Sequence, residues 1–218
     1  DAYQSITELI DQSVQRYATR PASYNSGVSL TYTEMDNLSR DFAAFLQQEL
    51  QLKKGDRIAI MLPNVLQYPV VLFAALRAGL IVVNVNPLYT ASELIFQINN
   101  SEATTIVALS NFAATVEKAL PEMKMLKNII ITDLGDLFPW PKALMTNFVL
   151  KYILRKIPSY HLPKVISFKQ GLKQGRDLGF KRVDISNEDT AFLQYTGGTT
   201  GVSKGAILTH RNIIANLQ

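Results

Sequence analysis

Residues 57–85 read RIAIMLPNVLQYPVVLFAALRAGLIVVNV, and this stretch decides the fold class. Its two ends, 57–61 and 81–85, are apolar, largely β-branched runs without polar alternation, which is typical of strands covered on both faces. The residues between them, 67–78, predict a helix that Gly79 ends. A strand, a helix and a second strand in this order predict neighbouring parallel strands.

The same alternation continues on both sides of this unit. Runs 105–109 and 128–132 predict two more strands of the same apolar kind. Three capping boxes, in each of which a Ser or Thr precedes a Glu by three residues, predict helices that begin near residues 5, 31 and 90. The first is expected to end near 18 and the second near 50. We therefore expect an α/β fold with a mostly parallel sheet flanked by helices.

The composition is that of a globular protein. The chain has 218 residues, of which 47% are apolar and 18% charged, and it has no cysteine. It therefore excludes a disordered chain, a disulfide scaffold, a thiolate zinc site and a cysteine nucleophile. The first residues lack the basic start and apolar core of a signal peptide, and no run reaches the roughly 18–20 apolar residues of a spanning helix. We expect a cytoplasmic location.

Positive charge is concentrated in one stretch. Residues 142–182 hold ten basic side chains and one acid, Asp177, and we treat 139–182 as a basic insert. The simplest interpretation is a solvated surface insert. A second is a surface for anionic lipid, which would place the protein peripherally on the inner face of the membrane. No nucleic-acid-binding motif is present, so we expect no nucleic-acid partner.

Within this insert, residues 141–157 predict one helix. Asn147, Lys151 and Arg155 form a polar stripe, whereas apolar residues such as Phe148 and Tyr152 take most of the remainder. A helix of this kind fits a membrane interface but is too short to cross a bilayer. The alternative is a helix packed on the protein's own core.

The segment that carries chemistry lies near the end of the chain. Residues 190–195 and 206–209 predict strands, and the residues between them are rich in glycine and hydroxyl groups. Glycines allow backbone N–H groups to converge on an anion, while hydroxyls and a lysine add donors and charge, so the segment suits a polyphosphate. The alternative is a flexible surface hairpin. The candidate residues are Thr196, Gly197, Gly198, Thr199, Thr200, Gly201, Val202, Ser203, Lys204 and Gly205.

Three common motifs fail on this segment. The Walker A pattern requires a glycine before the lysine, but Ser203 precedes Lys204. The dinucleotide pattern fails because Gly197 and Gly198 are adjacent. Residues 201–205 match the nucleophile elbow literally, but a strand instead of a helix follows, and no acid follows Ser203 to complete a triad.

The string YTGGTTGVSKGAILTH, residues 195–210, closely resembles the phosphate-loop signature of the adenylate-forming superfamily, which includes acyl-CoA synthetases, luciferases and nonribosomal adenylation domains. Residues 30–35 (LTYTEM), 55–64 (GDRIAIMLPN) and 77–90 (RAGLIVVNVNPLYT) also resemble segments of that family. With the insert included, the closest resemblance is to bacterial long-chain fatty-acid–CoA ligases, and it covers essentially all 218 residues.

This resemblance implies a two-step reaction. A carboxylate attacks the α-phosphate of ATP to give an acyl-adenylate and pyrophosphate, and the thiol of CoA then attacks the adenylate. By resemblance, residues 196–205 hold the β- and γ-phosphates, Thr196 contacts Mg²⁺, and Lys204 binds pyrophosphate. The implied partners are therefore fatty acid, ATP and CoA.

The resemblance also implies that much of the enzyme lies beyond residue 218. We find no magnesium glutamate, no ribose-binding aspartate and no catalytic lysine of the family, so we predict no catalytic residue in this chain. Residues 1–218 are expected to be the N-terminal half of the large AMP-binding domain and to be inactive alone. Apolar surface exposed on such a half favours a homo-oligomer. The alternative is a non-catalytic nucleotide- or membrane-binding module with the same fold.

Overall fold

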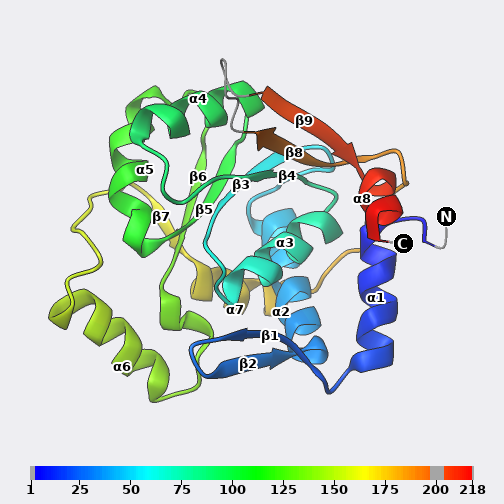
Figure 1. The fold of residues 1–218 in the computed structure, drawn as a ribbon, viewed down its shortest axis with the longest axis horizontal. Helices are drawn as coiled ribbons and strands as arrows, with labels where there is room; N and C mark the ends of the chain where they lie inside the picture. Colours follow the sequence, from blue (N-terminus) through cyan, green and yellow to red (C-terminus); the bar gives the residue numbers. More distant parts are fainter. Residues whose placement is uncertain (1–2, 197–203, 218) are drawn as a thin grey trace.

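A seven-stranded sheet forms the centre of the molecule (Figure 1). The computed structural model describes residues 3–196 and 204–217. The strand order is β7-β6-β5-β3-β4-β8-β9, in which every neighbouring pair is parallel except β8 and β9. The strands of this sheet are β3 (Arg57–Met61), β4 (Ile81–Asn84), β5 (Thr105–Leu109), β6 (Asn128–Thr132), β7 (Val165–Ser167), β8 (Thr190–Thr196) and β9 (Lys204–Thr209).

Helices cover both faces of the sheet. Alternate residues of β3 point to opposite sides, so Ile58 and Ile60 pack in one core cluster and Ala59 and Met61 in the other. The first cluster contains α1 (Ile6–Tyr17), α2 (Tyr32–Ala44), α3 (Gln67–Arg77) and α7 (Phe168–Leu178). The second contains α4 (Ala91–Ser101) and α5 (Ala113–Ala119). Helix α8 (His210–Leu217) adds Ile214 to the first cluster, and α6 (Lys142–Phe148) is the remaining helix of the described residues. The short turns are η1 (Phe45–Glu49), η2 (Ser110–Phe112), η3 (Leu120–Glu122), η4 (Leu134–Leu137) and η5 (Val149–Ile153).

The predicted strands and helix starts are confirmed. All four apolar runs are strands, and the helix between the first two ends at Arg77 before Gly79, whose φ is +72°. Thr31 and Thr90 each form a complete capping box. Ser5 also caps α1 by accepting the N–H of Glu8, but the Glu8 carboxylate accepts from Gln4. No helix among the described residues has the length and apolar content needed to cross a membrane.

Other elements had no clear signal in the sequence. The hairpin of β1 (Pro21–Asn25) and β2 (Val28–Thr31) turns at Ser26 and Gly27, both at positive φ, and its strands are short.

The basic stretch 139–182 does not form one unit in the structure. Strand β7 extends the sheet and α7 packs on the core, whereas α6 stands apart from the sheet at the lower left of Figure 1.

The helix predicted over 141–157 is shorter than expected. It consists of α6 followed by the π-helical turn η5, which ends at Ile153. Neither element contains a fully buried residue, and only the small Ala143 packs against the first core cluster, so the helix predicted here meets the protein's own core along a narrow contact. Periodicity identified an amphipathic segment, but it could not show which side faces the protein.

Helix α7 approaches α2 very closely. Its buried residues, Phe168, Gly171, Leu172 and Gly175, recur at helical spacing, and its lysines lie on the opposite, solvated side. A Cβ on Gly175 would lie 1.8 Å from the carbonyl oxygen of Asp41. This contact requires a glycine because any side chain would push the two helices apart.

We expect Gly175→Ala to lower the free energy of unfolding by about 3 kcal/mol, because the methyl group overlaps the α2 backbone. Urea unfolding of a protein that carries this chain measures the change. The control is Gln170→Ala on the exposed side of α7, which should be nearly neutral. Equal midpoints for both variants would contradict the close contact.

Candidate functional site

The predicted phosphate-binding segment connects two paired strands. Thr196, the last residue of β8, pairs with Lys204, the first residue of β9. Since β8 runs parallel to β4, Thr196 lies at the edge where the carboxyl ends of the parallel strands meet. Ligands of open α/β sheets bind at this edge. The topology therefore gives the hairpin a position suited to binding.

The structure describes three of the ten predicted site residues. Thr196 and Lys204 are exposed side chains opposite each other, and Gly205 follows within β9. The other seven lie outside the described residues: Gly197, Gly198, Thr199, Thr200, Gly201, Val202 and Ser203.

Gly205 has a packing role beside the predicted segment. It pairs with Tyr195 across the hairpin, and a Cβ at Gly205 would lie 3.0 Å from the Tyr195 ring. The Tyr195 hydroxyl donates a 2.6 Å hydrogen bond to Oδ1 of Asn100 on α4, and burial raises the pKa of the phenol. A neutral Tyr195 thus ties the hairpin to the helix layer below it.

A polar network lies at the same edge of the sheet, around Asn84 at the end of β4. The Tyr68 hydroxyl donates to Asn84 Oδ1 at 3.0 Å, and the Asn84 amide nitrogen lies 3.4 Å from Gln194 Oε1. The buried side chain of Gln97 donates to the Asn84 carbonyl at 2.8 Å. These contacts hold the ends of β4 and β8 in fixed relative positions.

Sequence reasoning missed this network. Its signal was a polar residue, Asn84, within the apolar run 81–85. A polar residue at the end of a buried strand must find partners, and here it finds them on α3, α4 and β8.

The described donors do not form a complete metal site. No group of three or more His, Asp or Glu residues that could hold a metal ion occurs within residues 3–196 and 204–217. The hydroxyl of Thr196 is a hard oxygen of the kind that Mg²⁺ accepts. A single hydroxyl fits an ion that takes its other ligands from a bound polyphosphate or from further residues.

His210 lies at the end of the β8–β9 hairpin opposite to Thr196 and Lys204. It begins α8, and the preceding residue, Thr209, pairs with Thr190 roughly 17 Å along β9 from Lys204. There the buried imidazole accepts a hydrogen bond at Nδ1 from the N–H of Ile6, at 3.2 Å. His210 therefore ties α8 to the start of α1.

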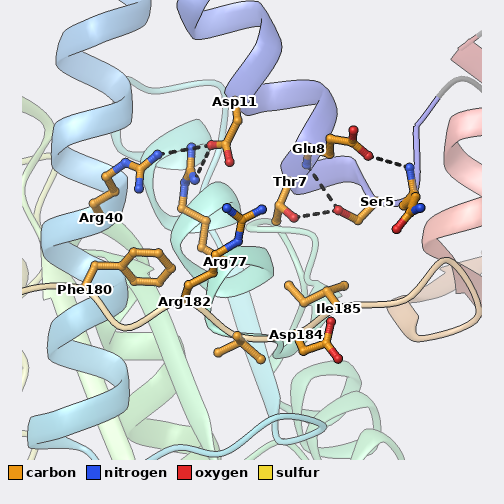
Figure 2. A pocket seen from close by; sticks show the side chains of 12 residues that line it. Ser5, Thr7, Glu8, Asp11, Arg40, Arg77, Phe180, Arg182, Asp184 and Ile185 are labelled. Atoms are coloured by element: carbon orange, nitrogen blue, oxygen red, sulfur yellow. Dashed lines mark hydrogen bonds and ion pairs between the residues drawn. The ribbon is translucent and has the colours of Figure 1, made fainter.

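A large pocket lies at the amino-terminal edge of the sheet, away from Thr196 and Lys204. It has a volume of about 820 Å³, and Arg77, the last residue of α3, lines it together with α1, α2 and the segment 180–185 (Figure 2). Arg77 is almost fully buried and forms ion pairs with Asp11, at 2.7 Å, and with Asp36. Arg40 pairs with the same two carboxylates, at 3.2 and 2.8 Å. These charges link three helices, so the cluster is structural.

Comparison with known proteins is consistent across sequence and structure. The AMP-binding enzyme family model matches residues 10–218. The chain is 54% identical over 218 residues to the long-chain-fatty-acid–CoA ligase of Escherichia coli O157:H7. That alignment covers all of this chain and 39% of the relative, so the chain spans about two fifths of the curated relative's length.

Solved structures show the same fold. The anthranilate CoA ligase AuaEII in complex with anthranoyl-AMP matches with a TM-score of 0.76 at 17% identity, over 97% of this chain and 36% of that one. A putative long-chain-fatty-acid CoA ligase from Rhodopseudomonas palustris CGA009 matches with a TM-score of 0.76 at 18% identity, over 99% of this chain and 47% of that one.

The buried His210 predicts acid sensitivity. Burial lowers the pKa of His210 to about 4, with Lys54 acting in the same direction and Asp189 opposing it. The neutral imidazole is favoured in the fold, so its stabilisation is complete above pH 6.5 and is lost as the pH falls towards 4. The loss should reach about 3 kcal/mol by pH 4.

Urea unfolding between pH 7 and 4 measures this loss. The matched variant is His210→Asn, whose Oδ1 can still accept from Ile6 but does not titrate. Its stability should fall less steeply over the same range. Parallel curves for the two proteins would show that His210 is not the source of the acid sensitivity.

Proposed function

The chain belongs to the AMP-binding enzyme family, and we propose that it forms the N-terminal part of a long-chain fatty-acid–CoA ligase. The observation that carries this proposal is the 54% identity, over all 218 residues of this chain, to a protein named long-chain-fatty-acid–CoA ligase. The reaction converts ATP, a fatty acid and CoA into acyl-CoA, AMP and pyrophosphate through an acyl-adenylate. ATP and CoA are thus substrates of the whole protein.

In this proposal the β8–β9 hairpin binds the β- and γ-phosphates of ATP. The supporting observations are its place at the carboxyl edge of the sheet and the exposed Thr196 and Lys204 at the base of its tip. Lys204 contributes a positive charge for pyrophosphate and no proton transfer, because a fatty acid is already ionised at neutral pH. The backbone N–H groups of the segment stabilise the charge on the phosphates.

Magnesium is the metal that fits this site. The Thr196 hydroxyl would contact the ion, and the nucleotide phosphates would supply most of its ligands. When bound, Mg²⁺ neutralises phosphate charge and thereby lowers the repulsion that an incoming carboxylate meets.

The adenylation and thioester chemistry of this proposal needs residues outside the chain. We expect the 218 residues alone to be inactive. The alternative, a non-catalytic nucleotide- or membrane-binding module, is less well supported because the closely similar relatives are named as ligases across several bacteria.

Two further parts of the proposal concern location and assembly. The basic stretch 142–182 supports peripheral attachment to an anionic membrane on its cytoplasmic side, where a long-chain fatty acid is available. Ile207 on β9 and Leu217 on α8 are apolar and both more than half exposed, which supports contact of this end of the chain with a second copy.

Fatty-acid-dependent ATP–pyrophosphate exchange tests the ligase assignment. We expect exchange with palmitate in a protein of the relatives' full length that carries these residues, and none in the 218-residue chain. Absence of exchange with every fatty acid tested, in a folded full-length protein, would reject the assignment.

The role of Thr196 has a matched pair of variants in the same assay. Thr196→Ala removes the hydroxyl and should lower exchange by about ten- to a hundredfold, whereas Thr196→Ser keeps it and should retain most of the activity. If the two variants are equally active, the hydroxyl has no contact with the phosphates or their metal ion.

A further inference from the structure

We propose that α6 and η5 dock the protein on an anionic lipid bilayer, with the apolar side of α6 inserted among the headgroups. We call residues 140–156 the α6–η5 arm. This inference rests on the membrane attachment proposed above and assigns it to one surface. Figure 1 shows the arm between β6 and β7 in the chain, away from the helices that cover the sheet.

The arm is amphipathic in the opposite sense to an ordinary surface helix, which turns its polar side to water. Two polar side chains of α6 contact the protein: Asn147 accepts the N–H of Gly135 at Oδ1, at 2.8 Å, and Lys142 donates to the carbonyl of Ser26 at 2.6 Å. The large apolar side chains of α6 point outward, while the small Ala143 packs against the first core cluster. Leu144, Met145, Phe148, Lys151 and Tyr152 recur at helical spacing on the outward side.

The outward side is strongly exposed. Phe148 and Tyr152 are 56% and 60% exposed although their rings lie 5.1 Å apart. An exposed group of large apolar side chains marks an interaction surface. The arm's exposed large apolar residues are Trp140, Leu144, Met145, Phe148, Tyr152, Ile153 and Leu154, each more than half exposed.

Polar contacts hold the arm in this orientation at both ends. Besides the Lys142 contact at its start, the amide of Asn111 donates to the carbonyl of Lys156 at 3.0 Å. The arm therefore presents its apolar side without needing to refold, and binding would cost little ordering entropy.

The charge of the arm indicates that its partner is an anionic bilayer. Lys151 lies on the outward side beside the Tyr152 ring, and Arg155 and Lys156 follow directly, whereas no acid occurs between Asp136 and Asp177. Lysine and arginine next to tryptophan and tyrosine suit the anionic headgroup region of a bilayer. A second copy of this chain would bring like charges together. The arm precedes β7, which is at the opposite edge of the sheet from β9. It is therefore separate from Ile207 and Leu217, which we proposed above to contact a second copy.

The test is flotation of the full-length protein with vesicles of phosphatidylcholine, with or without phosphatidylglycerol. We expect binding only to the anionic vesicles. Lys151→Glu with Lys156→Glu should weaken it by at least about tenfold, and Phe148→Ser with Tyr152→Ser by a similar factor. These side chains are exposed, so the variants should fold.

The matched controls lie on the solvated side of α7 within the same basic stretch. Lys169→Glu with Lys173→Glu makes the same charge change, and Leu178→Ser removes an exposed apolar side chain; both should bind like the wild type. A blue shift of fluorescence on vesicle binding that Trp140→Phe abolishes would place the arm itself in the lipid.

Four results would overturn the assignment. Arm variants that bind like the wild type, or α7 variants that weaken binding equally, would show that the arm is not the docking surface. Protection of Trp140 from a soluble quencher in the absence of vesicles would show that protein already covers the arm. If the arm variants also abolish a dimer, the covering protein is a second copy; if they do not, it is the rest of the same protein. A wild type that binds no vesicle would remove membrane attachment altogether, while palmitate-dependent exchange would still support the ligase.

Discussion

Burial of both faces of strand β3 is the constraint on which the rest of the structure depends. Its alternate side chains enter two separate core clusters, so helices must cover both sides of the sheet. Among the described residues, α1, α2, α3, α7 and α8 contribute to the cluster on one side, and α4 and α5 to the cluster on the other. The strands β3, β4 and β5 are parallel because a helix, α3 or α4, returns the chain from the carboxyl end of one strand to the amino end of the next.

This arrangement separates two polar regions. The carboxyl edge of the sheet carries the hairpin, Asn84 and the polar network, and its polar groups are arranged around strand ends. The amino edge carries the buried Arg77 ion pairs, which join α1, α2 and α3, together with the His210 contact to α1. In the first region Thr196 and Lys204 are exposed, whereas the ion pairs of the second fix the positions of helices. The pocket beside Arg77 therefore lies at the structural edge of the sheet, whereas the candidate site lies at the carboxyl edge.

The basic stretch contains two helical segments that expose different kinds of side chain. In α7 the lysines are solvated while Gly171, Leu172 and Gly175 pack against α2. In the α6–η5 arm Asn147 and Lys142 hold the segment to the protein, and the large apolar side chains are exposed. Charge counting cannot distinguish these cases, because lysine and arginine outnumber the acids in both segments. The difference lies in which neighbour each face meets.

The sequence by itself determined the α/β class, the four apolar strands, the capped helix starts and the hairpin strands around the predicted phosphate-binding segment. These depend on local pattern: apolar runs, capping boxes and glycine stops act over a few residues. Only the tertiary structure decided the strand order, the burial of His210 against α1, the partners of Asn84 and the outward direction of the arm's apolar side. Each of these depends on residues far apart in the chain, and side-chain periodicity carries no information about which distant surface a face will meet.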